Sequence, residues 1–197
     1  GFRLAKGGAQ ELFGVTPDLS TFGKGMANGM PLSAVVGKRE IMMEMENIFF
    51  SGTFGGELLS LSAANYVIDR YKKEDVPKQI THNGAILNQK IEEIISENDL
   101  NKVLHLSGHD SWKFLNWSDY SDTSSTEIRT YFMQEMFANG LLILNTHNIS
   151  LSVDSKIIES IFHSYNEVLG QMSRFLKNGD LKNQLKVLPL APLFKVR

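Results

Sequence analysis

The sequence predicts a fold of mixed helix and strand, in the α/β or α+β class. Long segments with apolar residues at helical spacing alternate with short runs of β-type residues, in the order helix, strand pair, helix, strand pair and long helix. An order of this kind builds an α/β or α+β sandwich of packed layers. The chain has 197 residues, of which 42% are hydrophobic, and this is enough for one good core or two small ones.

The first elements are short. Residues 7–13 predict a loop that leads into a short helix, which a glycine closes. Residues 19–22 predict a short strand, and residues 32–36 form a second short apolar run. The Asn28-Gly29 pair between them predicts a turn.

Lys24 lies where the first of these strands ends, between Gly23 and Gly25. Small residues on both sides let a ligand approach the backbone closely, which suits a flat cofactor. Taken alone, however, a lysine between two glycines is more often an ordinary residue of a surface turn.

Residues 38–46 predict a short helix with apolar residues at helical spacing, Met42 and Met45 among them. We expect these side chains to fill a core rather than to bind a soft metal, because methionine packs into irregular gaps. Thr53 follows in the glycine-rich loop 48–56. A hydroxyl beside exposed backbone N–H groups suits an anion, and the same threonine also suits the N-cap of the next helix.

Residues 58–73 predict an amphipathic helix whose small residues allow close packing against another element. The charged cluster 69–75 ends this helix. We therefore place a domain boundary there and expect two domains, residues 1–75 and residues 76–197.

Residues 76–96 predict a second long helix, with Pro77 in its first turn and Gly84 lowering its stability by about 1 kcal/mol relative to alanine. Its predicted core stripe is Leu87, Ile91, Ile94 and Ile95. Residues 103–106 and 112–117 predict a strand pair around a turn at residues 107–110.

The adjacent residues His109, Asp110 and Ser111 contain the side-chain types of a hydrolase triad. Neighbours on one turn rarely converge, and triad members normally come from separate segments. We therefore assign no hydrolase activity to them.

The last elements are a helix over residues 126–139, short strands over residues 141–144 and 148–152, and a long amphipathic helix. Either Ser152 or Asp154 is expected to cap that last helix.

Composition excludes several functional classes. The net charge of −2 leaves no basic excess for nucleic acid, and the chain contains no cysteine for disulfides or thiolate metal sites. The 5 histidines are scattered without ligand spacing. No apolar run approaches the roughly 20 residues of a membrane span. We expect no metal, no nucleic acid and no membrane.

Four motifs stand in order near the start of the chain: GFR at residues 1–3, GVTPDL at 14–19, GK at 23–24 and GMP at 29–31. A further block, SGTFGG, follows at residues 51–56. Together they closely resemble the active-site lysine region of the class III (subgroup II) aminotransferases that depend on pyridoxal 5'-phosphate. The nearest resemblance is to the glutamate-1-semialdehyde 2,1-aminomutase branch.

The resemblance implies a fold-type I pyridoxal-phosphate-dependent transferase. Residues 1–75 would then be the C-terminal part of the large cofactor domain, and residues 76–197 the α+β small domain. It also implies an aminotransferase or aminomutase that moves an amino group through a Schiff base between the cofactor and Lys24. Lys24 would carry protons as well.

Further expectations follow from the resemblance. In the family, the threonine that matches Thr53 contacts the cofactor phosphate of the neighbouring subunit, which implies a homodimer. The substrates would be a small-molecule amine and an aldehyde or keto compound, and the location would be cytoplasmic. The family aspartate that pairs with the pyridine nitrogen precedes GFR and is not in this sequence. The resemblance therefore implies the C-terminal half of an enzyme, which we expect to be inactive alone.

Substrate choice is less defined. Many aminotransferases of this class grip an α-carboxylate with an arginine near the C-terminal strands, whereas residues 144–150 contain none. That absence resembles the aminomutase branch and its relatives that act on sugars or other non-standard amines. Arg3 is equally suited to a substrate carboxylate and to a structural one.

Two alternatives to an enzyme remain. The chain is either a non-catalytic or truncated homologue with a structural or binding role, or a generic nucleotide-binding α/β domain. The second is disfavoured, because Lys24 is followed by glycine rather than by the Ser or Thr of a phosphate-binding P-loop.

Overall fold

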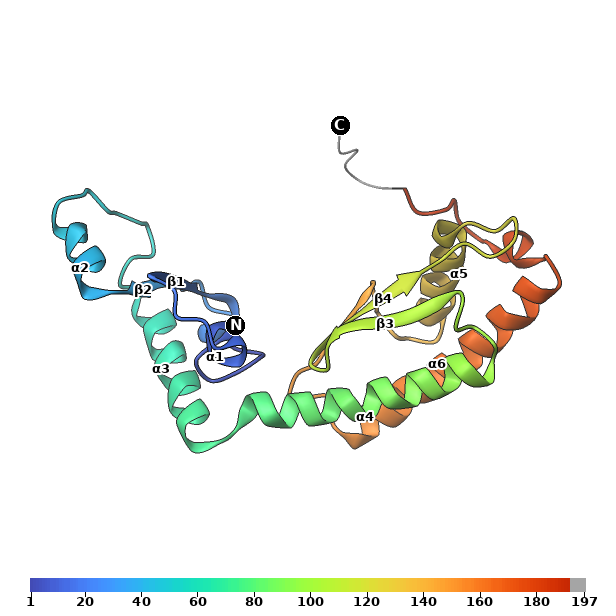
Figure 1. The fold of residues 1–197 in the computed structure, drawn as a ribbon, viewed down its shortest axis with the longest axis horizontal. Helices are drawn as coiled ribbons and strands as arrows, with labels where there is room; N and C mark the ends of the chain where they lie inside the picture. Colours follow the sequence, from blue (N-terminus) through green and yellow to red (C-terminus); the bar gives the residue numbers. More distant parts are fainter. Residues whose placement is uncertain (192–197) are drawn as a thin grey trace. The chain divides into compact units, whose positions relative to one another are not determined.

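The computed structural model describes residues 1–191 and divides the chain into two compact units, Gly1–Gln79 and Ile80–Arg197. Figure 1 labels most of their helices and strands. The six residues 192–197, which complete the predicted second domain, lie outside the described residues.

The first unit is made of short elements and one longer helix. In chain order these are α1 (Ala9–Phe13), β1 (Leu19–Phe22), the 3₁₀ turn η1 (Lys24–Met26), β2 (Ala34–Gly37), α2 (Arg39–Met42), the 3₁₀ turn η2 (Met43–Glu46) and α3 (Leu58–Lys73). Strands β1 and β2 pair antiparallel, from Leu19 opposite Gly37 to Phe22 opposite Ala34. The predicted strand before Lys24 is therefore confirmed, and the second apolar run supplies its partner.

A small core joins the Lys24 segment to α3. Its buried members are Met26, Ala27 and Ala64, and the half-buried Phe2, Phe22, Leu32, Ala34 and Ala63 pack against them. Alanine side chains on α3 let the backbone after Lys24 approach the helix closely. The predicted close packing of the small residues in this helix is thus confirmed.

One prediction for the first unit is wrong. The methionine segment does not form core: neither α2 nor η2 contains a buried residue, and Met45 is 38% exposed. The wide apolar face of α3 is also largely open, with Leu58 78% and Tyr66 69% exposed. Both results have the same cause, because among residues 1–191 no element of the first unit covers these faces.

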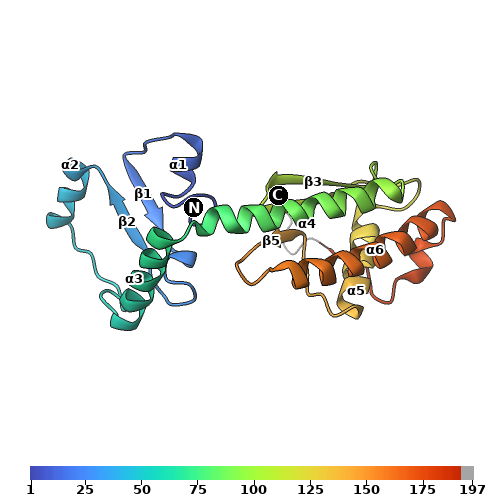
Figure 2. The same ribbon diagram turned by 90° about the horizontal axis from the view of Figure 1, so that it is seen from below.

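The second unit is built on a three-stranded antiparallel sheet with helices on it (Figure 2). Its elements are α4 (Val76–Glu97), which begins in the last residues of the first unit, β3 (Leu104–His109), β4 (Trp112–Trp117), α5 (Ser125–Ala138), β5 (Thr146–Asn148), α6 (Ser155–Lys177) and the 3₁₀ turn η3 (Leu181–Gln184). Strand β4 is central and pairs with both β3 and β5.

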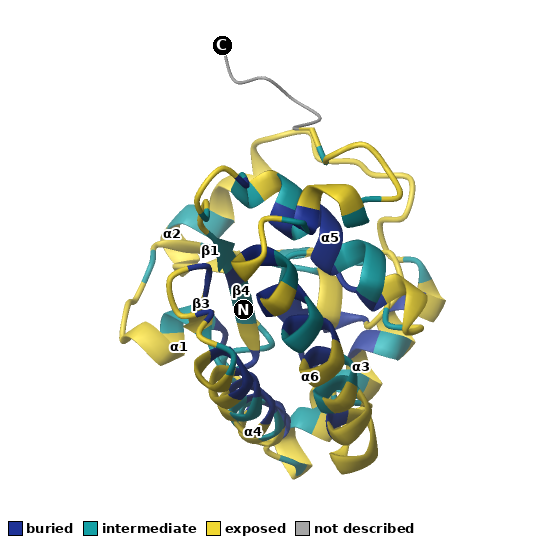
Figure 3. Ribbon diagram, turned by 90° about the vertical axis from the view of Figure 1, so that its right-hand side faces the viewer, coloured by how far each residue is buried: buried dark blue, intermediate teal, exposed yellow. Residues whose placement is uncertain are grey.

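The inner faces of α4, α5 and α6 form the main core, drawn dark blue in Figure 3. The predicted stripe Leu87, Ile91, Ile94 and Ile95 on α4 is fully buried, which confirms it. The ring of Phe132 on α5 contacts Trp117 of β4 and Tyr165 of α6 at centroid distances of 4.9 and 5.3 Å. Aromatic contacts thus join two helices to the sheet.

The predicted hairpin exists, but its turn is shorter than expected. Pairing continues to His109 opposite Trp112, so the turn contains only Asp110 and Ser111. Gly108 adopts a φ of 93°, which lets the strand continue to the turn.

The end of the chain differs from the prediction in three places. Residues 141–144 form no strand, and the third strand is 146–148 rather than 148–152. The α6 N-cap is Asp154, whose carboxylate accepts from the Ile157 backbone N–H at 3.0 Å, so Ser152 is not the cap. Short runs of this kind have no periodicity that identifies a strand without its partner.

The division into units falls about one helical turn after the boundary predicted at Asp75, within the first turns of α4. The identity of the units as parts of a large and a small domain remains a prediction. Within residues 1–191, no helix has both the length and the apolar character that crossing a bilayer requires. The same residues bring together no three histidine or acidic side chains that are arranged to hold a metal.

Candidate functional site around Lys24

Lys24 is the first residue of η1 and directly follows the extended Gly23 after β1. Its φ is 50°, in the left-handed region. A non-glycine residue pays about 1–2 kcal/mol for this conformation, and such outliers cluster at functional sites. The lysine therefore occupies a backbone position that glycine or asparagine would fill more easily.

The backbone around Lys24 is held on both sides. Met26 and Ala27 are 7% and 1% exposed in the small core, and the Met26 N–H donates to the Gly23 carbonyl at 3.1 Å. The Lys24 side chain itself is exposed. Among residues 1–191 its ammonium makes no hydrogen bond and no ion pair. A fixed backbone thus carries an exposed amine that a ligand can reach.

Aromatic rings tie the start of the chain to the Lys24 segment. The Phe2 ring meets Phe22 edge-on at 5.7 Å and Tyr71 of α3 at 5.5 Å. The Tyr71 hydroxyl donates to the Phe2 carbonyl at 3.0 Å. Burial raises the pKa of Tyr71, and the nearby positive charge of Arg3 offsets part of that rise.

The glycines beside Lys24 are not crowded by this chain. A β-carbon on Gly23 would lie 3.5 Å from Ser33, and one on Gly25 would lie 3.7 Å from the Phe2 β-carbon. Both are ordinary contact distances. Contacts within residues 1–191 therefore do not require glycine at these two positions. That the glycines admit a ligand stays a prediction.

Thr53 lies in an exposed turn, residues 53–56, just before α3. The Gly55 N–H donates to the Gly52 carbonyl at 2.9 Å and closes this turn. The helix cap is Glu57, whose carboxylate accepts from two backbone N–H groups of the first turn of α3, at 2.8 and 2.7 Å. The alternative that Thr53 caps the helix is therefore wrong. Among residues 1–191 its hydroxyl makes no hydrogen bond.

The two predicted site residues both belong to the first unit. In the part of the chain that the structure describes, no hydrogen bond links Lys24 with Thr53. The exposed Lys24 amine belongs to η1 and the exposed Thr53 hydroxyl to the turn 53–56, two different segments of the unit. The expectation that they serve different subunits stays a prediction.

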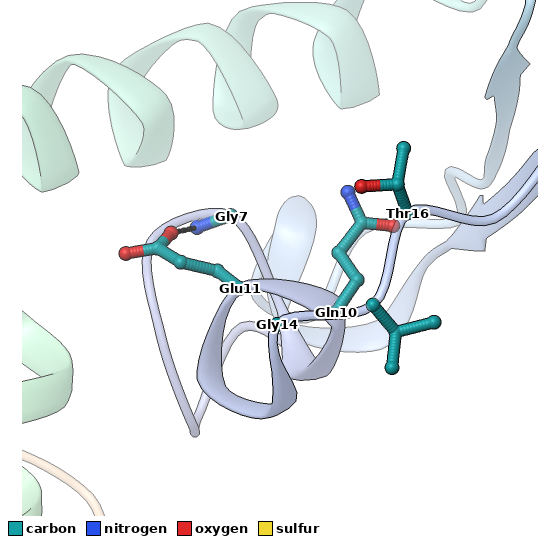
Figure 4. A pocket seen from close by; sticks show the side chains of 6 residues that line it. Gly7, Gln10, Glu11, Gly14 and Thr16 are labelled. Carbon is teal, nitrogen blue, oxygen red and sulfur yellow. Dashed lines mark hydrogen bonds between the residues drawn. The ribbon is translucent and has the colours of Figure 1, made fainter.

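An open hollow of about 320 Å³ lies beside α1 (Figure 4). It is lined by Gly7, Gln10, Glu11, Gly14, Val15 and Thr16. Two of the polar side chains here already have partners: Glu11 accepts from the Gly7 N–H, and Gln10 accepts from the Ser20 hydroxyl. Neither Lys24 nor Thr53 lines it, so we assign it no part in the site.

The His109 and Ser111 side chains do converge, contrary to the expectation for neighbours on one turn. His109 Nδ1 and Ser111 Oγ are 2.9 Å apart. Ser111 is fully buried, however, and the Asp110 carboxylate contacts Asn88 and Lys113 instead of the histidine. These contacts stabilise the turn, and a buried hydroxyl is not an available nucleophile.

Sequence reasoning missed a buried polar pair in the arginine-free segment 144–150. His147 Nε2 lies 2.6 Å from the Tyr165 hydroxyl, and both side chains are buried. Burial lowers the pKa of His147 to about 4 and raises the pKa of Tyr165 well above its usual value. A lone histidine in a three-residue strand gives no signal of its partner 18 residues later on a helix.

Comparisons with known proteins agree on one family. Residues 4–174 match the family described as aminotransferase class-III. A glutamate-1-semialdehyde 2,1-aminomutase of Methanosarcina acetivorans is 32% identical over 181 residues, which cover 86% of this chain and 42% of the relative. A 3-aminobutyryl-CoA aminotransferase of Cloacimonas acidaminovorans is 41% identical over 98 residues, covering 49% of this chain and 24% of that relative.

Solved structures support the predicted fold. A transaminase with pyridoxal phosphate bound matches with a TM-score of 0.79 at 21% identity, over 89% of this chain and 43% of that one. A β-phenylalanine aminotransferase from Variovorax paradoxus matches with a TM-score of 0.73 at 19% identity, over 87% of this chain and 42% of that one. The predicted fold class, that of the fold-type I transferases, is thereby confirmed. The chain spans about two fifths of the length of the aminomutase relative and of these two solved structures.

Proposed function

This chain belongs to the class-III aminotransferase family, and from that membership we propose that it is part of a pyridoxal-phosphate-dependent aminotransferase or aminomutase in which Lys24 holds the cofactor covalently. The observation that carries the proposal is Lys24 itself. An exposed amine without a hydrogen-bond or ion-pair partner in residues 1–191 stands on a strained backbone, at the centre of the family-like motifs.

The residues present fit such a cofactor. The Lys24 ammonium is not held back by an acidic partner in the described residues, so its amine can reach an aldehyde. When bound, pyridoxal phosphate acts as an electron sink for carbanion chemistry. The part of Lys24 is then to hold the cofactor in place and, when released from it, to move a proton to and from the substrate.

For Thr53 we propose a contact with the cofactor phosphate of a neighbouring subunit. The exposed hydroxyl and the glycine-rich backbone of residues 52–56 form a turn of the kind that accepts anions. The finding that Glu57 caps α3 supports this proposal, because it leaves the threonine without a structural task in the described chain. The active protein would then be a homodimer in which each site needs both subunits.

The proposed substrates are a small-molecule amine and an aldehyde or keto compound. The names of the curated relatives, an aminomutase acting on glutamate 1-semialdehyde and an aminotransferase acting on 3-aminobutyryl-CoA, favour a substrate other than an ordinary α-amino acid. The arginine-free segment 144–150 favours the same choice, because it offers no guanidinium for an α-carboxylate. We retain the cytoplasm as the proposed location, on family grounds.

We also propose that the 197-residue chain alone is inactive and holds the cofactor weakly. It spans 42% of the length of the aminomutase relative, and Lys24 and Thr53 are its only assigned cofactor residues. The competing proposal is a non-catalytic homologue with a structural or binding role. It would keep the Lys24 motif but not its covalent chemistry.

A labelling experiment tests Lys24. A longer protein that contains this chain would be purified with pyridoxal phosphate, reduced with borohydride and mapped by peptide mass spectrometry. We expect the label on Lys24, and no label and no turnover in Lys24→Ala. Lys38→Ala is the matched control, because Lys38 is an exposed lysine of the same unit that pairs with Asp18. A label on another lysine would favour the non-catalytic alternative.

A second experiment tests Thr53 in the same protein. We expect Thr53→Ala to weaken cofactor affinity by about tenfold, the effect of one hydrogen bond to a charged group, while the urea midpoint of unfolding stays unchanged. Ser51→Ala, two residues earlier in the same loop, is the control. Equal cofactor affinity in Thr53→Ala and the parent would remove Thr53 from the site.

A further inference from the structure

The chain contains four Asn-Gly pairs, which differ in their burial and hydrogen bonding. They are Asn28-Gly29, Asn83-Gly84, Asn139-Gly140 and Asn178-Gly179. In such a pair the backbone nitrogen of the glycine can attack the asparagine side-chain amide, because no side chain on the glycine hinders the approach. Whether it does so depends on how freely both groups move and on whether that N–H is already engaged.

One pair lies inside a helix. Asn83 and Gly84 lie inside α4, and the Asn83 side-chain amide donates to the Val153 carbonyl at 2.9 Å. Gly84 is buried, and a β-carbon on it would lie 2.1 Å from the Asp110 carbonyl oxygen. Neither the side chain nor the backbone of this pair can rearrange without opening the core.

Two further pairs lie at the ends of helices, and the glycine N–H of each pair donates a hydrogen bond. Gly140 donates to the Phe137 carbonyl at 3.0 Å, and Gly179 donates to the Leu176 carbonyl at 3.2 Å. The Asn139 side-chain amide also donates into the last turn of α5, at 2.9 Å. The attacking nitrogen in each pair must first leave its hydrogen bond.

The fourth pair is open. Asn28 and Gly29 are both exposed and both have positive φ, 45° and 108°, at the centre of a turn that the Met30 N–H closes on the Ala27 carbonyl at 3.3 Å. Within residues 1–191, neither the Gly29 N–H nor the Asn28 side-chain amide makes a hydrogen bond. Both reacting groups are thus exposed to water and unengaged.

We propose that Asn28 is a site of spontaneous deamidation in the folded protein. The Gly29 nitrogen loses its proton to hydroxide and forms a bond to the Asn28 side-chain carbon, and ammonia leaves, which closes a succinimide ring. Water then adds to one of the two ring carbonyls and opens the ring to aspartate or isoaspartate. The balance is one water consumed and one ammonia released, with no oxidant and no enzyme.

The product changes the segment directly after η1. A neutral amide becomes a carboxylate, and the isoaspartate form adds a carbon to the backbone of the turn. The neighbouring Ala27 is 1% exposed and belongs to the small core that fixes the Lys24 backbone. A longer backbone in the turn therefore disturbs the packing of this buried residue. The modification itself is independent of the proposed function.

The test compares the four sites in one sample. The full chain would be incubated at mildly alkaline pH, digested with trypsin and analysed by mass spectrometry that separates asparagine, aspartate and isoaspartate peptides. The four pairs fall in four different peptides, residues 25–38, 79–90, 130–156 and 178–182. We expect Asn28 to convert at least about fivefold faster than Asn139 and Asn178, the factor that one hydrogen bond of about 1 kcal/mol represents.

A parallel incubation in urea separates structure from local sequence. Unfolding removes the hydrogen bonds of the three protected pairs, so we expect the four rates to converge. Conversion of Asn28 no faster than Asn139 and Asn178 in the folded chain would overturn the proposal. An Asn28 lead of the same size in urea would also overturn it, since structural protection would not be its cause. Asn28→Asp supplies the aspartate peptide standard.

Discussion

At the scale of single residues, local geometry and burial decide what a side chain can do. Lys24 is exposed on a left-handed backbone, whereas His147 is buried against Tyr165 with only one ring nitrogen engaged among the described residues. The motifs around Lys24 identified it in the sequence. Nothing in the sequence indicated the environment of His147, because its partner is brought to it by the packing of α6 on β5.

The buried His147 predicts an acid-sensitive stability. Burial lowers its folded pKa from the ordinary 6.5 to about 4, so between these values the unfolded chain binds more protons than the folded one. The contribution of the neutral, buried His147 to the free energy of unfolding is therefore fully present above pH 6.5. It is lost as the pH falls towards 4, and the loss amounts to about 3 kcal/mol in total. Urea unfolding of the full chain at several pH values measures this loss.

His147→Gln is the informative variant, because it keeps a polar group beside Tyr165 but removes the titration. We expect its unfolding free energy to depend less on pH between 4 and 6.5 than that of the parent. Tyr165→Phe is the control: it removes the 2.6 Å contact but leaves the histidine buried, so the pH dependence should persist. Parallel pH curves for His147→Gln and the parent would refute the assignment.

At the scale of elements, the structure explains why Gly84, a residue of low helix propensity, lies inside a helix. Gly84 lies in the middle of α4, where propensity alone favours alanine. The carbonyl of Asp110 in the β3–β4 turn approaches so closely that a β-carbon would lie 2.1 Å from it. Only glycine leaves room for the hairpin to pack against α4 at this position, although it is a poor helix former. The Asn88 side-chain amide donates to the same Asp110 carbonyl at 3.1 Å.

Gly84→Ala should therefore destabilise the chain by about 1–3 kcal/mol, the usual effect of overpacking, despite its better helix propensity. Gly170→Ala on α6 is the matched control. A β-carbon there meets only the Asn98 side chain, at 3.6 Å, so we expect a gain of up to about 1 kcal/mol. Urea unfolding measures both. Equal gains in the two variants would contradict the proposed packing of the hairpin on α4.

At the scale of the whole molecule, the two units differ in how their apolar residues are covered. The second unit buries most of the apolar stripes of α4, α5 and α6. The first unit exposes large side chains along residues 48–61, with Phe49 96% and Phe50 75% exposed. Apolar surface of this extent is typical of an interaction site, and it lies on both sides of Thr53.

We therefore expect the full chain to self-associate through this segment, in line with the proposed homodimer. Phe49→Ser should weaken the association by about tenfold or more, because it removes an almost fully exposed aromatic side chain from the contact. Sedimentation velocity over a range of protein concentrations measures the change. Phe137→Ser, at a 43% exposed phenylalanine on α5, is the control and should leave association unchanged.

Equal association of the two phenylalanine variants would exclude residues 48–61 from the contact. A chain that stays monomeric at every concentration would also remove this support for the homodimer. The prediction is independent of cofactor chemistry, because it needs no pyridoxal phosphate in the sample.

The sequence by itself determined the long elements and the site candidates. The bounds of β1 and α3, the buried stripe of α4 and the turn at Asn28-Gly29 follow from local patterns that depend only on neighbours along the chain. The motifs around Lys24 and Thr53 are likewise local. Sequence patterns of this kind also sufficed to predict the family.

Only the tertiary structure decided which side chains meet. In the structure Glu57 rather than Thr53 caps α3, and the third strand is β5. His147 contacts Tyr165, Met45 is exposed, and the Asp110 carbonyl packs against Gly84. The physical reason is common to these cases. Burial, strand pairing and close packing depend on segments far apart in the sequence, and local periodicity carries no information about those partners.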